Sequence, residues 1–74
     1  MLGEVLKAAR QEAGLTQEDL AARAKVSREY VSKLERDLQS PTVDTLMRIC
    51  AILGTRASVL LSRVEEKPAR RLER

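Results

Sequence analysis

Residues 28–36 concentrate polar side chains whose types and spacing suit directional hydrogen bonding. Val31 and Leu34 are the apolar positions that would anchor a helix here. With about 100° per residue measured from this pair, the side chains that point most directly outward are Glu29, Lys33 and Arg36. Lysine and arginine donate to guanine O6 and N7, and glutamate accepts from cytosine N4. A charged helix face is more often simply exposed to solvent. Whether this face binds a partner therefore has to be judged from its position in the fold.

Further groups flank this outward face. Ser32 lies on one side of it and Tyr30 on the other, while Arg28 projects from the first turn. Ser27 precedes the helix and is the residue type that caps a helix N-terminus. The face therefore begins at a capped helix end, where phosphate is also bound well.

A second short helix must hold this face in place. Thr16 is followed three residues later by Asp19, which predicts a capping box and a helix start. After it, Leu20, Ala21 and Ala24 recur at three- and four-residue spacing and form a narrow apolar stripe. Because two of these three residues are alanines, we expect a neighbouring element to pack very closely.

The two helices are separated by a short turn that contains the apolar residue Val26. Such a turn is too tight for the helices to lie antiparallel, so the second helix has a buried inner side and a bare outer side. A protruding helix with polar residues outward fits the major groove of DNA. The sequence thus predicts a DNA-binding protein.

Here the chain resembles a known family. The segments that carry the resemblance are Leu15 to Ala21, Val26 to Arg28, Leu34 to Arg36, Ser40 to Thr42, Leu46, and Leu53 with Gly54. Together they are similar to the Cro/repressor (Xre-type) helix-turn-helix family over roughly residues 3–62. A single helix-turn-helix motif is a weak signal, whereas agreement at many separated positions is a strong one.

The resemblance implies a compact, all-α domain of five helices, in which the second and third helices form the helix-turn-helix. It also implies that Gln17 contacts phosphate or base edges and that the third helix reads bases. Arg10 and Glu35 match positions that pair in some members, and Glu35 lies on the inward side, where an unpaired carboxylate is costly. The resemblance and the helical projection together give the predicted DNA-binding residues, which are Gln17, Ser27, Arg28, Glu29, Tyr30, Ser32, Lys33 and Arg36.

Two residues depart from the family pattern. Lys25 stands in the turn and Asp37 follows the Leu-Glu-Arg run, and at both places the family usually has glycine. Glycine suits a left-handed backbone there, so we expect a local strain of roughly 1 kcal/mol at Lys25 and less at Asp37. Neither residue belongs to the predicted reading face.

The remaining helices supply the rest of the core. The first helix is expected over about residues 2–13, ended by Gly14, and it turns Leu2, Leu6 and Ala9 inward. Thr42 is expected to cap the fourth helix, which Gly54 ends. Its predicted core residues are Val43, Leu46, Ile49, Cys50 and Leu53.

The fifth helix, expected to start between Thr55 and Ala57, carries more apolar surface than one face can bury. Leu60 is the predicted core residue, and Val59, Leu61 and Val64 are predicted to form a homodimer interface, as the resemblance also implies. Residues 1–64 would then be the DNA-binding domain. Residues 65–74 are expected to be a charged, mostly disordered tail, with a basic arm that touches phosphates as the alternative.

Composition limits the classes of function. The chain has 74 residues, one cysteine and no histidine. It contains no cluster of metal ligands and no glycine-rich phosphate loop. We therefore expect that the protein is not an enzyme and binds no metal or cofactor. Its longest apolar run, residues 49–53, is far too short to span a membrane. With no signal peptide in view, we expect a cytoplasmic protein. The net charge of +3 suits a polyanion, yet residues 16–39 hold five basic and five acidic side chains.

The predicted function is a homodimeric transcriptional regulator that binds double-stranded DNA at a two-fold related operator. The alternative is a protein-interaction module that keeps the fold, such as the antitoxin partner of a toxin. Because no second domain is visible, we expect no small-molecule ligand, and regulation would act through protein level, as in controller proteins of restriction-modification systems.

Overall fold

The computed structural model describes residues 1–66, all of whose regular elements are helices. They are α1 (Leu2–Glu12), α2 (Gln17–Ala24), α3 (Arg28–Glu35), α4 (Val43–Leu53) and α5 (Ala57–Glu66). The predicted all-α, five-helix fold is confirmed. Helix α5 runs two residues beyond the expected domain boundary at residue 64, and residues 67–74 of the predicted tail lie outside the described part.

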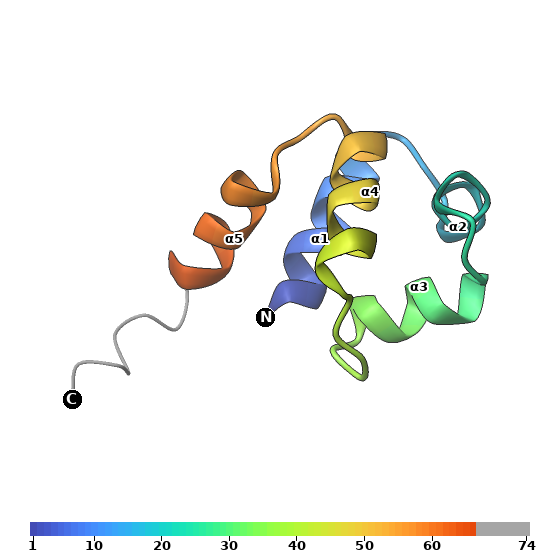
Figure 1. Ribbon diagram of the computed structural model, residues 1–74, viewed down its shortest axis with the longest axis horizontal. Coiled ribbons are helices and arrows are strands. Elements are labelled where there is room, and N and C mark those ends of the chain that lie inside the picture. The colour runs from blue at the N-terminus through green and yellow to red at the C-terminus, as the bar shows by residue number, and fades with distance from the viewer. Residues whose placement is uncertain (67–74) are drawn as a thin grey trace.

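Each helix contributes to one core. In Figure 1, α1 lies behind α4 at the centre, α2 and α3 lie on one side, and α5 lies on the other. Helix α1 packs on α3 and α5, and α4 packs on α2 and α5. The buried apolar side chains of this core are Val5, Leu6, Ala9, Leu20, Ala21, Ala24, Val31, Leu34, Leu46, Ile49, Cys50 and Leu60.

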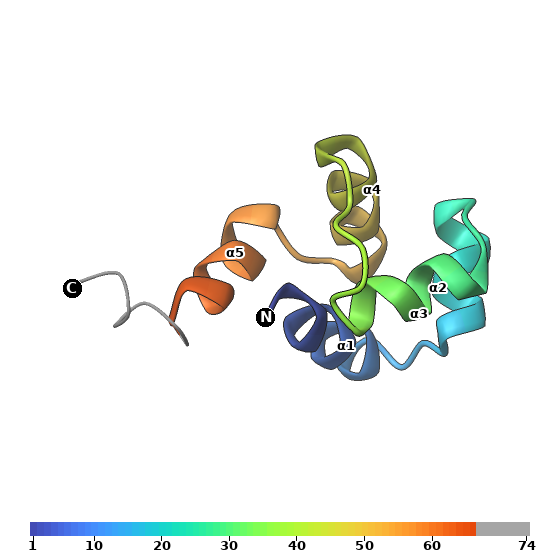
Figure 2. The same ribbon diagram turned by 90° about the horizontal axis from the view of Figure 1, so that it is seen from below.

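The predicted core is largely confirmed, with one clear error in α4. Val43 is 76% exposed although its spacing from Leu46 favoured burial. It is the first residue of α4. The first turn of α4 projects beyond the neighbouring helices, which cover only the later turns (Figure 2). Leu53 is only half-buried but packs against the core. Val5, which is not among the predicted core residues, is 6% exposed and belongs to the core.

Helix α1 approaches the end of α3 very closely. A Cβ atom on Gly3 would lie 2.4 Å from the carbonyl oxygen of Glu35 and 2.8 Å from that of Leu34. Glycine therefore lets two helix backbones meet with no side chain between them. The contact fixes the C-terminal end of α3 against the first turn of α1.

Glycines also end two helices, as predicted. Gly14 follows α1 with φ of 75°, and Gly54 follows α4 with φ of 73°. Thr42 caps α4, because its hydroxyl accepts from the N–H of Thr45 at 3.1 Å. Within residues 1–66 no single helix is long and apolar enough to cross a membrane; α4 and α5 reach the required length and hydropathy only together, across a bend of 103°.

Candidate nucleic-acid interface

The first turn of α2 is fixed by the predicted capping box. The N–H of Asp19 donates to the Thr16 hydroxyl at 3.0 Å, and the Thr16 N–H donates to the Asp19 carboxylate at 3.1 Å. Hydrogen bonding of the Asp19 carboxylate, first to the Thr16 backbone and then to the Thr16 side chain, lowers the pKa of Asp19 below its ordinary value of 3.8. An ionised carboxylate at this end also complements the helix dipole.

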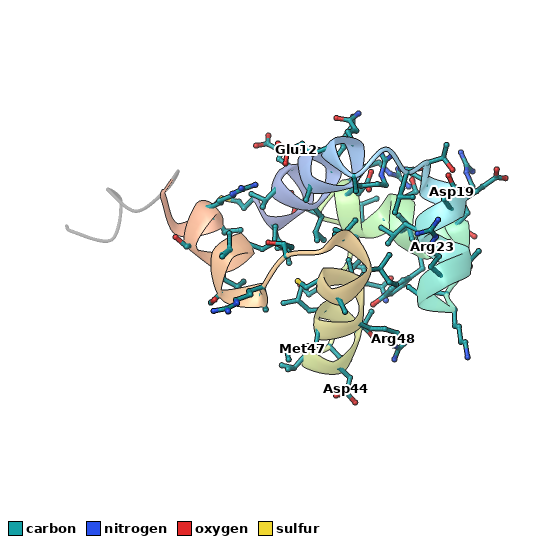
Figure 3. The ribbon with its side chains drawn as sticks, turned by 90° about the horizontal axis from the view of Figure 1, so that it is seen from above. Glu12, Asp19, Arg23, Asp44, Met47 and Arg48 are labelled. Carbon is teal, nitrogen blue, oxygen red and sulfur yellow. The ribbon has the colours of Figure 1, made fainter. Side chains whose placement is uncertain are left out.

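The turn after α2 adopts the left-handed backbone expected at the family's glycine position. Lys25 has φ of 61° and caps α2, and Val26 is half-buried against the core. Arg48 of α4 donates from Nη1 to the carbonyl oxygen of Ala24 at 2.8 Å, and Figure 3 shows Arg48 on the side of α4 that faces α2. This contact was not predicted from the sequence.

Helix α3 begins at Ser27, whose hydroxyl accepts from the N–H of Tyr30 at 3.0 Å. This confirms the predicted cap. Figure 1 shows α3 along the lower edge of the domain, and Figure 2, which looks onto that edge, shows α3 in the foreground, crossing α2. The helix is thus held from one side, and its other side is open.

The predicted reading residues differ in exposure. Those that are exposed are Ser27, Arg28, Glu29 and Arg36, and those that are half-buried are Gln17, Tyr30, Ser32 and Lys33. Tyr30 packs partly against the core, so it offers less of its ring than its flank position suggested. Arg36 is the residue after α3, and its Nε donates back to the Ser32 carbonyl at 3.3 Å. Arg28 and Glu29 are therefore the exposed charged groups within α3 itself.

A buried ion pair ties α1 to α3, at the two positions expected from the resemblance. Arg10 Nε and Nη2 donate to the two carboxylate oxygens of Glu35 at 2.6 and 3.1 Å, and both residues are 8% exposed. The third guanidinium nitrogen, Nη1, donates to the Leu15 carbonyl at 2.8 Å. The Gln17 amide also donates to Glu35, at 3.0 Å. Gln17, predicted to face DNA, is thus linked to the core pair.

Asp37 closes the other end of α3. It has φ of 59°, as expected at the second glycine position of the family. Its carboxylate accepts from the Met1 amino group at 2.5 Å and from the Gly3 N–H at 2.9 Å. These two hydrogen bonds lower the pKa of Asp37 below its ordinary value. The start of α1 is thereby held against the segment that follows α3.

Helix α5 exposes apolar side chains on either side of the buried Leu60. Val59 and Leu61 are 41% and 43% exposed, whereas Leu60 between them is fully buried. Val64, also predicted at the homodimer interface, is half-buried and packs against the core. Only part of its side chain is therefore exposed for contact with another molecule. Met47, 57% exposed, is a further apolar residue outside the predicted interface, and it lies on the side of α4 opposite Arg48 (Figure 3).

Charge is distributed unevenly along the chain. Residues 1–66 contain ten basic and ten acidic side chains, whereas residues 67–74 contain four basic and one acidic. The net charge of +3 therefore comes entirely from the last eight residues. In the part that the structure describes, attraction to a polyanion must therefore depend on the positions of individual polar and basic groups and not on an excess of positive charge.

Comparison with known proteins gives consistent relatives. The helix-turn-helix family model matches residues 6–60. The uncharacterised HTH-type transcriptional regulator y4dJ of Sinorhizobium fredii is 38% identical over 92% of this chain and 88% of its own length. SinR, a master regulator of biofilm formation crystallised with DNA, has a TM-score of 0.78 at 35% identity over 82% of this chain and 98% of that one.

The wild-type restriction-modification controller protein C.Esp1396I also matches, with a TM-score of 0.76 at 32% identity. This likeness covers 88% of the present chain and 86% of the controller protein. Against SinR of Bacillus subtilis at full length, the chain spans 60% of the relative.

Proposed function

The chain belongs to the Cro/repressor (Xre-type) helix-turn-helix family of DNA-binding transcriptional regulators, and we propose that it regulates transcription as a homodimer bound to a two-fold related operator. The observation that carries the proposal is the capped, open start of α3, with Arg28 and Glu29 exposed beside the fixed turn. The relatives described above are named as regulators of transcription.

In this proposal α3 enters the major groove, and different side chains of α2 and α3 contact bases and phosphates. Arg28, Glu29 and Lys33 contact base edges, and Ser27 and Gln17 contact phosphates at the starts of α3 and α2. Replacing Arg28 or Lys33 by alanine should cost about 1–3 kcal/mol on the preferred site and relax preference at one position of each half-site.

The test is selection of bound DNA from a random pool, followed by titration of the selected site. Arg56→Ala is the matched control, because Arg56 is exposed in the α4–α5 loop, which lies at the opposite edge of the domain from α3 (Figure 1). An unchanged motif in both Arg28→Ala and Lys33→Ala would contradict the assigned reading face. Failure to select any motif, together with a co-purifying protein, would favour the interaction-module alternative.

The homodimer is supported by the exposed apolar side chains of Val59 and Leu61, which lie on either side of the buried Leu60 in α5. Two copies would present their α3 helices about one helical turn of DNA apart, roughly 34 Å. Val59→Asp with Leu61→Asp should give a monomer in light scattering and weaken binding to the repeated site. Met47→Asp is the control at another exposed apolar residue. A wild-type monomer at tens of micromolar and a selected motif without any repeat would refute the homodimer.

A further inference from the structure

The carboxylate of Glu35, the last residue of α3, accepts hydrogen bonds from side chains of α1 and α2. It receives two bonds from Arg10 in α1 and one from Gln17 at the start of α2, and Arg10 also reaches the α1–α2 loop. The Glu35 side chain is only 3% exposed. A buried carboxylate with three donors leaves little freedom to any of the groups that contact it.

This contact fixes which way the Gln17 amide faces. An ionised carboxylate can only accept, so the NH2 group of Gln17, and not its carbonyl oxygen, must turn toward Glu35. That NH2 group has two hydrogens, and the bond to Oε1 at 3.0 Å uses one. The other hydrogen is left on a half-buried side chain at the first position of α2, where an anion is favoured.

We propose that Glu35 is a positioning residue for DNA binding: it holds the Gln17 amide so that its second hydrogen donates to a backbone phosphate. This inference rests on the proposed DNA-binding function and adds a role to the core ion pair. A free glutamine side chain loses rotamer freedom when it is ordered by a ligand. Here that loss has already occurred in the free protein, so the phosphate contact is pre-organised.

The first test is made without DNA. The chain contains three glutamines, Gln11, Gln17 and Gln39, and no asparagine, so its side-chain amides give three pairs of NMR signals. Gln11 and Gln39 are exposed and serve as internal references. We expect the Gln17 amide to be ordered and slow to exchange in the free protein, and the other two to be mobile. Equal mobility of all three overturns the inference, whether or not the protein binds DNA.

The second test is a double-mutant cycle on DNA affinity. Gln17→Met keeps the length of the side chain and removes the donor, so it should weaken binding of the wild type about tenfold. In the Arg10→Met/Glu35→Leu background, where Gln17 has no carboxylate to hold it, the same change should cost less than about threefold.

The control is Arg28→Ala, whose effect on affinity should be the same in both backgrounds, because Arg28 takes no part in the hydrogen bonds of this cluster. Melting curves establish that the background is folded. An equal loss for Gln17→Met in both backgrounds overturns the positioning role, whereas absence of DNA binding by the wild type overturns the proposed function itself.

Discussion

Replacing Gly3 by alanine should destabilise the domain, although the same change within a helix usually has the opposite effect. Gly3 is the second residue of α1, so alanine would favour the helix by up to about 1 kcal/mol. Its new Cβ, however, would lie 2.4 Å from the Glu35 carbonyl oxygen and 2.7 Å from the carbonyl carbon. Both are backbone atoms, which cannot rotate out of the way.

The magnitude follows from these opposing terms. Overpacking costs about 1–3 kcal/mol and occasionally more, and a rigid backbone neighbour puts Gly3 at the upper end. After subtracting the gain in helix propensity, we expect a net loss of about 2 kcal/mol. For a domain of this size, that loss lowers the melting temperature by on the order of 10 °C. It would also push the end of α3 away from α1, at the residue that contacts Arg10 and Gln17.

Thermal and urea denaturation of Gly3→Ala and of Ala8→Gly measure both terms. Ala8 is exposed in the middle of α1, so Ala8→Gly reports the propensity term alone, about 1 kcal/mol. A Gly3→Ala variant at least as stable as the wild type would show that α1 and α3 are farther apart than the structure has them. DNA selection with the variant then tests whether the position of α3 affects the motif.

Three further changes test the same framework. Arg10→Met should cost about 3 kcal/mol or more, because Glu35 keeps its buried charge without its partner, and Arg10→Met/Glu35→Leu should recover much of this; an unchanged melting temperature of the single variant would contradict it. Lys25→Gly should gain up to about 1 kcal/mol by relieving the left-handed backbone, less the freedom that glycine has in the unfolded chain. A drop of about one unit in the salt slope of DNA binding would instead indicate a phosphate contact by Lys25. Because the pKa of Asp19 is lowered on folding, its hydrogen bonds stabilise the domain above pH 3.8, and this contribution is lost as pH falls through the lower folded pKa. Asp19→Asn should therefore flatten the decline of stability below pH 4 in urea titrations at successive pH values.

Local signals in the sequence were reliable because short-range physics determines them. The caps at Thr16, Ser27 and Thr42 depend on a hydroxyl within three residues of a free N–H, and all three are present. The left-handed backbone at Lys25 and Asp37 followed from the family's glycine positions. The stripes Leu20, Ala21, Ala24 and Val31, Leu34 follow from helical periodicity alone.

Contacts between distant segments were harder to predict. Arg48 reaches the Ala24 carbonyl across 24 positions, and nothing in the local pattern around Arg48 marks it as a partner. Gly3 gives no sign of a close approach, since glycine at a helix start has several explanations. Val43 has the spacing of a core residue, and its exposure depends on where the neighbouring helices stop. Each error concerns the relative placement of helices, which periodicity does not specify.

The residues that depart from local rules gather around α3. Lys25 carries a left-handed backbone three positions before its first residue, and Asp37 carries another two positions after its last. A buried glycine and a buried ion pair both contact its final turn. Real sequences usually break local rules where function requires it and recover the cost elsewhere. Because residues 1–66 have no excess charge, the proposed recognition of DNA by this part of the chain would depend on geometry, and the departures occur where they fix α3 relative to α1 and α2.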